Sequence, residues 1–119
     1  MSLHPVYRLT VFVPPDAVDS LLEAIVREVS LRYGRYDHSA WWSADGVEQF
    51  RPLPGSTPTV GTPGHVTRVP TVRLEFAIQR DPDLLERVLN QAVIPNHPWQ
   101  EPAIFVDEAM ASASRPFGS

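Results

Sequence analysis

The sequence contains no cysteine, and all ten of its basic residues are arginine. The absence of cysteine excludes disulfide bonds, thiolate metal sites and cysteine nucleophiles. No apolar run approaches the ~20 residues that a membrane-spanning helix needs, so we expect no association with a membrane. The first residues lack the charged and apolar pattern of a secretory signal peptide. Together these absences predict a cytoplasmic protein.

Acidic residues outnumber basic ones by 14 to 10, which gives a net charge of -4 and a pI near 5.4. The arginines are scattered along the chain, whereas nucleic-acid-binding proteins usually carry a concentrated basic patch. We therefore expect no nucleic-acid partner. The 119 residues are enough for one domain with its own hydrophobic core.

The beginning of the chain predicts a strand followed by a helix. Residues 6–13 alternate apolar and polar side chains, as a half-buried strand does. Apolar residues then recur at helical spacing over 18–29. Asp16 precedes them and is the candidate N-cap of this helix, because its carboxylate can accept hydrogen bonds from unpaired backbone N–H groups.

A hairpin and a long loop are predicted next. Residues 36–44 have the composition of a strand, and Asp45-Gly46 favours a tight turn, so residues 47–51 are expected to fold back on that strand. The following segment, 52–70, holds five prolines and three glycines and is predicted to be an irregular loop. Loops of this length are often functional.

The second half repeats the order of strand and helix. Residues 71–79 alternate apolar and polar side chains and predict a long strand. Asp81-Pro82 starts a second helix, with aspartate as the N-cap and proline at the first helical position. Residues 103–107 predict a short last strand.

This order of elements predicts an α+β fold, the ferredoxin-like split β-α-β-β-α-β sandwich with an extra hairpin arm and a long Pro/Gly loop. Two amphipathic helices need one face of an antiparallel sheet to cover. The domain is expected over residues 1–108, and the small, polar residues 109–119 are expected to form a flexible C-terminal tail.

Two adjacent tryptophans, Trp41 and Trp42, lie in the predicted second strand and must point to opposite faces of the sheet. One is expected to enter the core under the helices. The other is expected on the far face, where an exposed aromatic surface is a candidate contact between copies of the chain. The alternative is that the predicted hairpin arm covers it.

Three short motifs occur in order along the chain. They are Tyr36-Asp37-His38, then Phe50-Arg51-Pro52-Leu53 with Gly55, Pro58, Gly61 and Gly64, then His97-Pro98-Trp99-Gln100-Glu101. Together they resemble the domain inserted in many bacterial members of the NGG-interacting-factor family, the dinuclear-metal proteins named GTP cyclohydrolase type 2 homologues. Trp99 and Gln100 stand where that insert has tyrosine and glutamate, and Glu48 stands where a glycine often precedes the phenylalanine.

The resemblance implies a free-standing PII/CutA-like domain that forms trimers. The metal-binding domain of the family is not part of this chain, so the family's metal ligands cannot be assigned to any residue here. The motif residues implied to form a ligand site are Tyr36, His38, Phe50, Arg51, Pro52, Gly61, Gly64, His97, Trp99 and Glu101. A separately encoded family member that lacks the insert is a second candidate partner.

A divalent metal is the alternative ligand, because imidazole and carboxylate groups bind zinc and copper. The candidate metal ligands are His38, His97 and Glu101. In the split fold, however, His38 and His97 begin segments at opposite ends of the sheet, so they are expected to meet only across a subunit boundary or beneath the long loop.

Two hypotheses follow from the sequence. The first is a non-catalytic binding or regulatory module that forms oligomers and holds its ligand at subunit boundaries. The second is a metal-binding protein or small metalloenzyme. The serines of the chain lack the Gly-x-Ser-x-Gly context of a hydrolase nucleophile, which favours the non-catalytic hypothesis.

Overall fold

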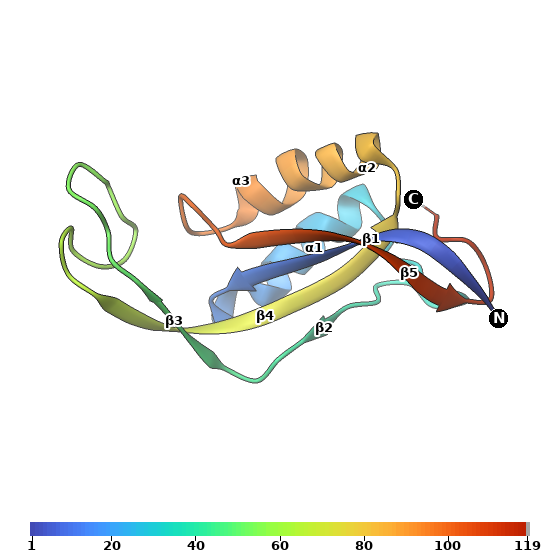
Figure 1. Cartoon of the computed structure of the whole chain (residues 1–119), viewed down its shortest axis with the longest axis horizontal. Coiled ribbons are helices and arrows are strands. Elements are labelled where there is room, and N and C mark those ends of the chain that lie inside the picture. Colours follow the sequence, from blue (N-terminus) through green and yellow to red (C-terminus); the bar gives the residue numbers. More distant parts are fainter. Residues whose placement is uncertain (119) are drawn as a thin grey trace.

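The computed structural model describes residues 1–118 as a twisted sheet with two helices (Figure 1). Its elements are β1 (Ser2–Val13), η1 (Pro15–Ala17), α1 (Val18–Glu28), β2 (Trp41–Trp42), β3 (Gly46–Phe50), β4 (Thr67–Gln79), α2 (Pro82–Arg87), η2 (Val88–Val93), α3 (Ile94–Asn96) and β5 (Ile104–Ala113). The segments α2, η2 and α3 follow one another without a break and form one long helix with a π-helical middle.

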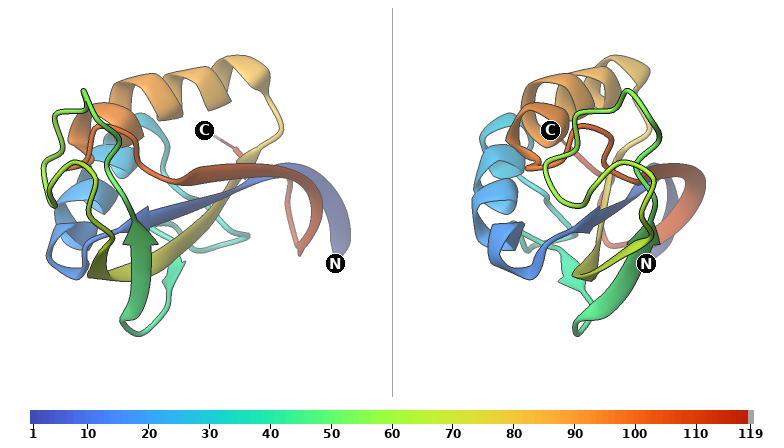
Figure 2. Two further views of the ribbon diagram at one scale, coloured as in Figure 1. Left: turned by 60° about the vertical axis from the view of Figure 1, so that its left-hand side comes forward. Right: turned by 90° about the vertical axis from the view of Figure 1, so that its left-hand side faces the viewer.

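The strands form an antiparallel sheet in the order β2-β4-β1-β5, with β3 also paired to β4. Both helices cover the same face of this sheet, and the other face is left open (Figure 2). This order is that of a split β-α-β-β-α-β fold, so the predicted ferredoxin-like α+β class is confirmed.

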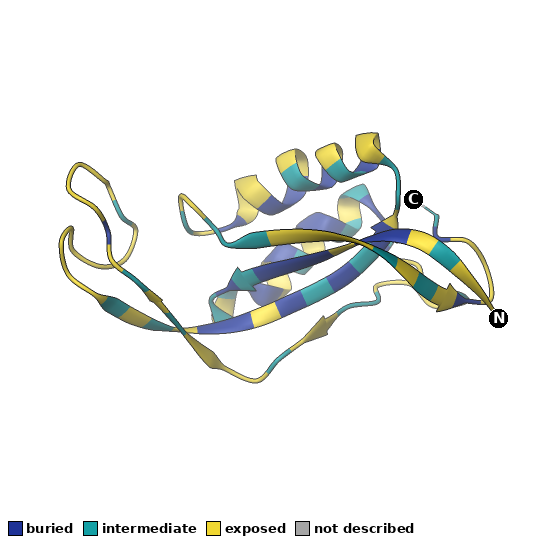
Figure 3. Cartoon of the chain, viewed as in Figure 1, coloured by how far each residue is buried: buried dark blue, intermediate teal, exposed yellow. Residues whose placement is uncertain are grey.

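The core lies between the sheet and the two helices (Figure 3). Alternate residues of β1 and β4 meet the apolar stripes of the helices, as the periodicities of 2.0 and 3.6 require. Its largest fully buried side chains include Leu9, Val11, Val13, Leu21, Ile25, Leu74, Ile78, Val88 and Val93. Trp42 does not join them and is 46% exposed, because β2 is a two-residue edge strand.

The predicted turn at Asp45-Gly46 is a bulge instead. Trp42 pairs with Leu74 and Gly46 pairs with Thr71, so three residues on one strand oppose two on β4. Gly46 does not have the positive φ that a type I′ hairpin turn requires. Strands β2 and β3 therefore run along β4 in the same direction, and the observed hairpin joins β3 to β4 through the long loop 51–66.

The last strand is longer than the predicted 103–107, because β5 continues to Ala113 and pairs with β1 back to Ser2. The small side chains in the second half of β5 are typical of a loop rather than of a strand. They let this part of β5 lie close to Val6 and leave room for Phe117, which is 5% exposed. The tail predicted from residue 109 thus begins inside β5, and its flexibility stays a prediction.

The two helices begin differently. The Asp81 carboxylate accepts hydrogen bonds from the backbone N–H groups of Asp83 (2.9 Å) and Leu84 (3.4 Å), as predicted. Asp16 lies within η1, and α1 begins after Ala17 without a side-chain cap, so the predicted role of Asp16 is wrong.

We expect Asp81→Ala to lower the free energy of unfolding by about 1 kcal/mol, because two backbone donors lose their acceptor. Urea denaturation monitored by circular dichroism measures this loss. The matched control, Asp16→Ala, is expected to stay within about 0.5 kcal/mol of the unaltered protein. An equal loss in both variants would contradict the capping role.

Candidate functional site

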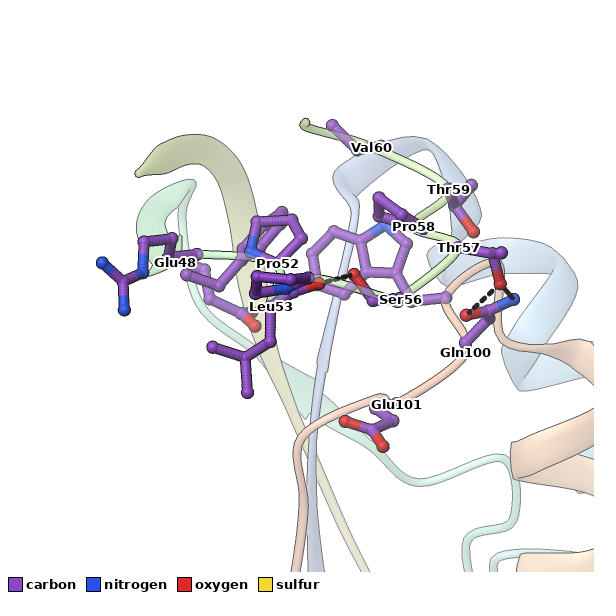
Figure 4. Close-up of a pocket in the computed structure, with 15 residues that line it drawn as sticks. Glu48, Pro52, Leu53, Ser56, Thr57, Pro58, Thr59, Val60, Gln100 and Glu101 are labelled. Carbon is purple, nitrogen blue, oxygen red and sulfur yellow. Dashed lines mark hydrogen bonds between the residues drawn. The ribbon is translucent and has the colours of Figure 1, made fainter. Parts of the chain in front are cut away.

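Strands β3 and β4 extend beyond the helices at one end of the sheet (Figure 1). A groove lies at this end (Figure 4). Loop 51–66 forms one side, and the connector between α3 and β5 forms the other. The groove has a volume of about 730 Å³, within the range of small-molecule sites. Its lining residues are Glu48, Phe50–Val60, Trp99, Gln100 and Glu101.

His97 fixes the connector to the sheet. It is 7% exposed, and its Nε2 lies 2.7 Å from the Phe12 carbonyl oxygen of β1. Its Nδ1 lies 3.1 Å from the backbone nitrogen of Trp99. A carbonyl can only accept and a backbone N–H can only donate, so His97 is the neutral tautomer that donates from Nε2 and accepts at Nδ1. Neither ring nitrogen is free to bind a metal or to act as a base.

Burial lowers the pKa of His97, because the surrounding protein disfavours the charged imidazolium. The hydrogen bond to the Phe12 carbonyl opposes this effect only in part. The imidazole is therefore held neutral, which is the form that can accept from Trp99.

Trp99 connects His97 to the long loop. Its ring centroid lies 5.5 Å from that of His97 and 6.1 Å from that of Phe50. Phe50 in turn packs on Gly61, where an added Cβ would lie 3.4 Å from both the Phe50 ring and Pro52 and 2.8 Å from the Thr67 hydroxyl. The loop needs glycine here for a second reason, since its φ is +91°.

Hydrogen bonds complete the closure of the loop. The Gly64 N–H donates to the Pro52 carbonyl at 2.7 Å, so the loop turns back on itself. Thr57 and Gln100 exchange side-chain hydrogen bonds across the groove, as Figure 4 shows. The Thr59 hydroxyl donates to the Pro98 carbonyl at 3.3 Å. The bonds of Thr57, Thr59 and Gln100 are exposed and individually weak, so they act together with the aromatic contacts to close the loop.

Six of the predicted site residues therefore form one connected cluster. They are Phe50, Pro52, Gly61, Gly64, His97 and Trp99. Arg51 and Glu101 are exposed and line the groove. They are not part of the cluster that holds the loop and the connector together. The motifs thus describe how the groove is built.

Glu48 is a groove residue that the sequence reasoning did not select. Burial raises the pKa of its carboxyl, and the neighbouring Thr71 hydroxyl partly opposes this. Within residues 1–118, Glu48 Oε1 and Thr71 Oγ1 are both buried and lack a hydrogen bond that meets normal geometry. The one sequence signal was that glutamate occupies a position where the resemblance leads us to expect glycine.

The two remaining predicted residues, Tyr36 and His38, lie elsewhere. They belong to the loop between α1 and β2, where the His38 backbone is bonded to Ser30 and its side chain pairs with Asp37 at 3.1 Å. Among residues 1–118, no three histidine, aspartate or glutamate side chains converge to hold a metal ion. His38, His97 and Glu101 therefore do not form a metal site within one chain.

Unfolding should become easier as the pH falls below the ~6.5 of an unfolded histidine, because unfolded His97 then binds a proton that the folded form takes up only at lower pH. The stabilisation is fully present above that pH and is lost as the pH falls through the lowered folded value. Urea unfolding between about pH 5 and pH 7.5 measures this slope. His97→Gln should flatten it, whereas His65→Gln, in an exposed part of the loop, should leave it unchanged. The same slope in the His97 variant would contradict this assignment.

Comparison with known proteins gives sequence relatives and structural neighbours. The GTP cyclohydrolase 1 type 2 homolog of Bacillus subtilis (strain 168) is 32% identical over 99 residues, which cover 83% of this chain and 26% of the relative. That of Listeria monocytogenes is 29% identical over 103 residues, 87% of this chain and 27% of the relative. The chain thus spans about a quarter of the length of these relatives. No family model matches the sequence.

The Bacillus cereus protein related to NIF3 superposes with a TM-score of 0.72 at 26% identity, over 92% of this chain and 27% of that one. CutA1 from Oryza sativa superposes at 0.64 and 16% identity, over 92% and 84% of the two chains. CPII, a nitrogen regulatory PII-like protein from Thiomonas intermedia K12, does so at 0.52 and 13% identity, over 96% and 100%. No helix among the described residues is long and apolar enough to cross a membrane. The chain is a PII/CutA-like domain that resembles the insert of the NIF3-related GTP cyclohydrolase 1 type 2 homologues.

Proposed function

We propose that the chain is a non-catalytic binding or regulatory module that works as a homo-oligomer, with a trimer favoured, and holds a small ligand in the groove at a subunit boundary. The observation that carries the proposal is a row of exposed aromatic side chains across the open face of the sheet.

This aromatic row crosses four strands, with aromatic side chains on β2, β1 and β5 and an arginine on β4, and its Phe12 is half-buried. Trp41 of β2 lies beneath the guanidinium of Arg73 of β4, whose Cζ is 5.3 Å from the ring centroid. Arg73 is paired with Phe12 of β1, and Phe12 meets Phe105 of β5 edge-on at 6.2 Å. Trp41 is 51% exposed and Phe105 is 56% exposed. A continuous aromatic surface on an uncovered sheet face favours contact with another protein surface.

Two pairs of polar residues in this face bond to each other, which also favours contact with a second copy. The Thr10 hydroxyl donates to Glu75 at 3.2 Å, and Arg8 lies 3.8 Å from Asp107. A partner that covers the row would therefore bury few unpaired polar groups, which are the costly ones. A standard interface takes ~800 Å² from each partner.

The composition of the groove favours ligand binding. Its walls combine the Trp99 ring, Phe50 and several prolines with a few polar groups, which is the usual composition of a ligand site. The histidine nearest to it, His97, has both nitrogens engaged in the support of the connector.

The assembly is tested by light scattering after size exclusion at micromolar concentration. We expect an oligomer for the unaltered chain and a monomer with unchanged circular dichroism for Phe105→Glu, because the charge would be buried without a partner. Ile94→Glu is the matched control, since Ile94 is 47% exposed on the helical side. A monomeric unaltered chain would overturn the homo-oligomer and leave the open face to a separately encoded family member.

The groove is tested by nuclear magnetic resonance with a library of small aromatic and anionic fragments. Bound fragments should shift the Trp99 indole and the Gln100 side-chain amide, which both line the groove. Trp99→Phe should weaken this binding, whereas Trp42→Phe, outside the groove, should leave it intact. Fragments that bind only elsewhere on the chain would sink the ligand site.

A further inference from the structure

Two sets of backbone hydrogen bonds close the loop between α1 and β2. The His38 N–H donates to the Ser30 carbonyl at 2.9 Å, and the Ser39 N–H donates to the Leu31 carbonyl at 3.0 Å. Nearer its tip, Tyr33 and Tyr36 exchange backbone hydrogen bonds of 2.7 and 3.0 Å around a two-residue turn. The loop 30–39 is therefore a preorganised element, although it is exposed.

Two residues of this loop, Leu31 and His38, have a φ of +54°, in the left-handed region that residues other than glycine rarely adopt. A residue in this region is strained and keeps its conformation only where the surroundings enforce it. The Leu31 side chain is 1% exposed, so the core holds the loop from inside. Tyr33 is held from outside by Phe117, with ring centroids 4.9 Å apart. Strain that the fold enforces in this way is concentrated at recognition sites.

The loop presents two unneutralised arginines. Arg32 and Arg35 line a pocket of about 280 Å³ together with Tyr36 and Asp37. Within residues 1–118, neither guanidinium makes an ion pair or a hydrogen bond. The one carboxylate in the pocket, Asp37, lies 3.1 Å from Nδ1 of the exposed His38 ring, a contact that is an ion pair only when the imidazole is protonated, so the two arginines exceed the carboxylate by one charge. The chain has 14 acidic residues and ten arginines, so a shortage of carboxylates does not explain why Arg32 and Arg35 lack an ion pair among residues 1–118.

We propose that this pocket binds the phosphate group of a small molecule. Two guanidinium forks offer more donors than the two oxygens of a carboxylate can accept, and they match a phosphate dianion. The Tyr36 hydroxyl, on a side chain that is 77% exposed, adds a further donor. The volume lies below the ~300–1,000 Å³ of pockets that enclose whole ligands, so it suits a head group.

The net charge of -4 does not prevent this binding. At physiological salt, exposed charges beyond ~8 Å are largely screened, so the two arginines dominate the local field. The site lies in the loop before β2, and none of its residues lines the groove at the other end of the sheet. The two sites can therefore be tested separately.

The experiment titrates the labelled full chain with inorganic phosphate, glycerol 3-phosphate and acetate at neutral pH and physiological salt, and follows the amide resonances of residues 30–39. We expect saturable shifts with both phosphates. Equal affinity for the two would mean that free phosphate is enough, and tighter binding of the ester would mean that the ligand extends beyond the pocket. Arg32→Gln combined with Arg35→Gln should weaken binding by about tenfold or more.

The matched control, Arg27→Gln with Arg68→Gln, removes the same charge from exposed arginines outside the pocket and should change the affinity less than about twofold. Circular dichroism confirms that both double variants are folded. The proposal is overturned if phosphate shows no saturable shift, if acetate binds as tightly, or if the control variant loses as much affinity.

Discussion

One buried imidazole determines the shape of the end of the molecule where the groove lies. His97 donates to a β1 carbonyl that is 85 residues away in the sequence and accepts from the backbone two residues ahead. This fixes the position of Trp99, Trp99 packs on Phe50, and Phe50 packs on the glycine where the long loop turns. A loop rich in proline and glycine cannot hold itself in place with regular backbone hydrogen bonds. The groove therefore depends on a chain of side-chain contacts that begins at His97.

The two ends of the sheet differ in how they achieve order. At the groove, a long loop is held by aromatic packing against a separate connector, so its two walls come from distant parts of the chain. At the opposite end, loop 30–39 is held by its own backbone hydrogen bonds and by the buried Leu31. The open face with its aromatic row lies between these ends. The domain thus places its candidate ligand sites at the two ends of the sheet and its candidate surface for assembly between them.

The periodicity of the sequence predicts both helices, β1 and β4, because apolar spacing reports directly which face of an element is buried. The turn predicted at Asp45-Gly46 is wrong, because the same dipeptide suits a tight turn or a bulge and the pairing with β4 determines which of them forms. The predicted last strand is also too short, because the alanines of β5 pair with β1 although they carry little strand signal. Most of the groove residues were found through the motifs. That these residues converge could not be predicted from the sequence, since their convergence rests on a tertiary hydrogen bond from His97 to Phe12.

The bulge between β2 and β3 separates the β3–β4 hairpin from the rest of the sheet, so the two parts can vary independently. It absorbs one unpaired residue between Trp42 and Gly46, so the pairing of β3 with β4 starts anew beyond it. Residues could be added to or removed from both arms of the β3–β4 hairpin without moving Trp41 or the core strands. The reach of the loop can therefore diverge between related domains while the sheet that carries it stays the same.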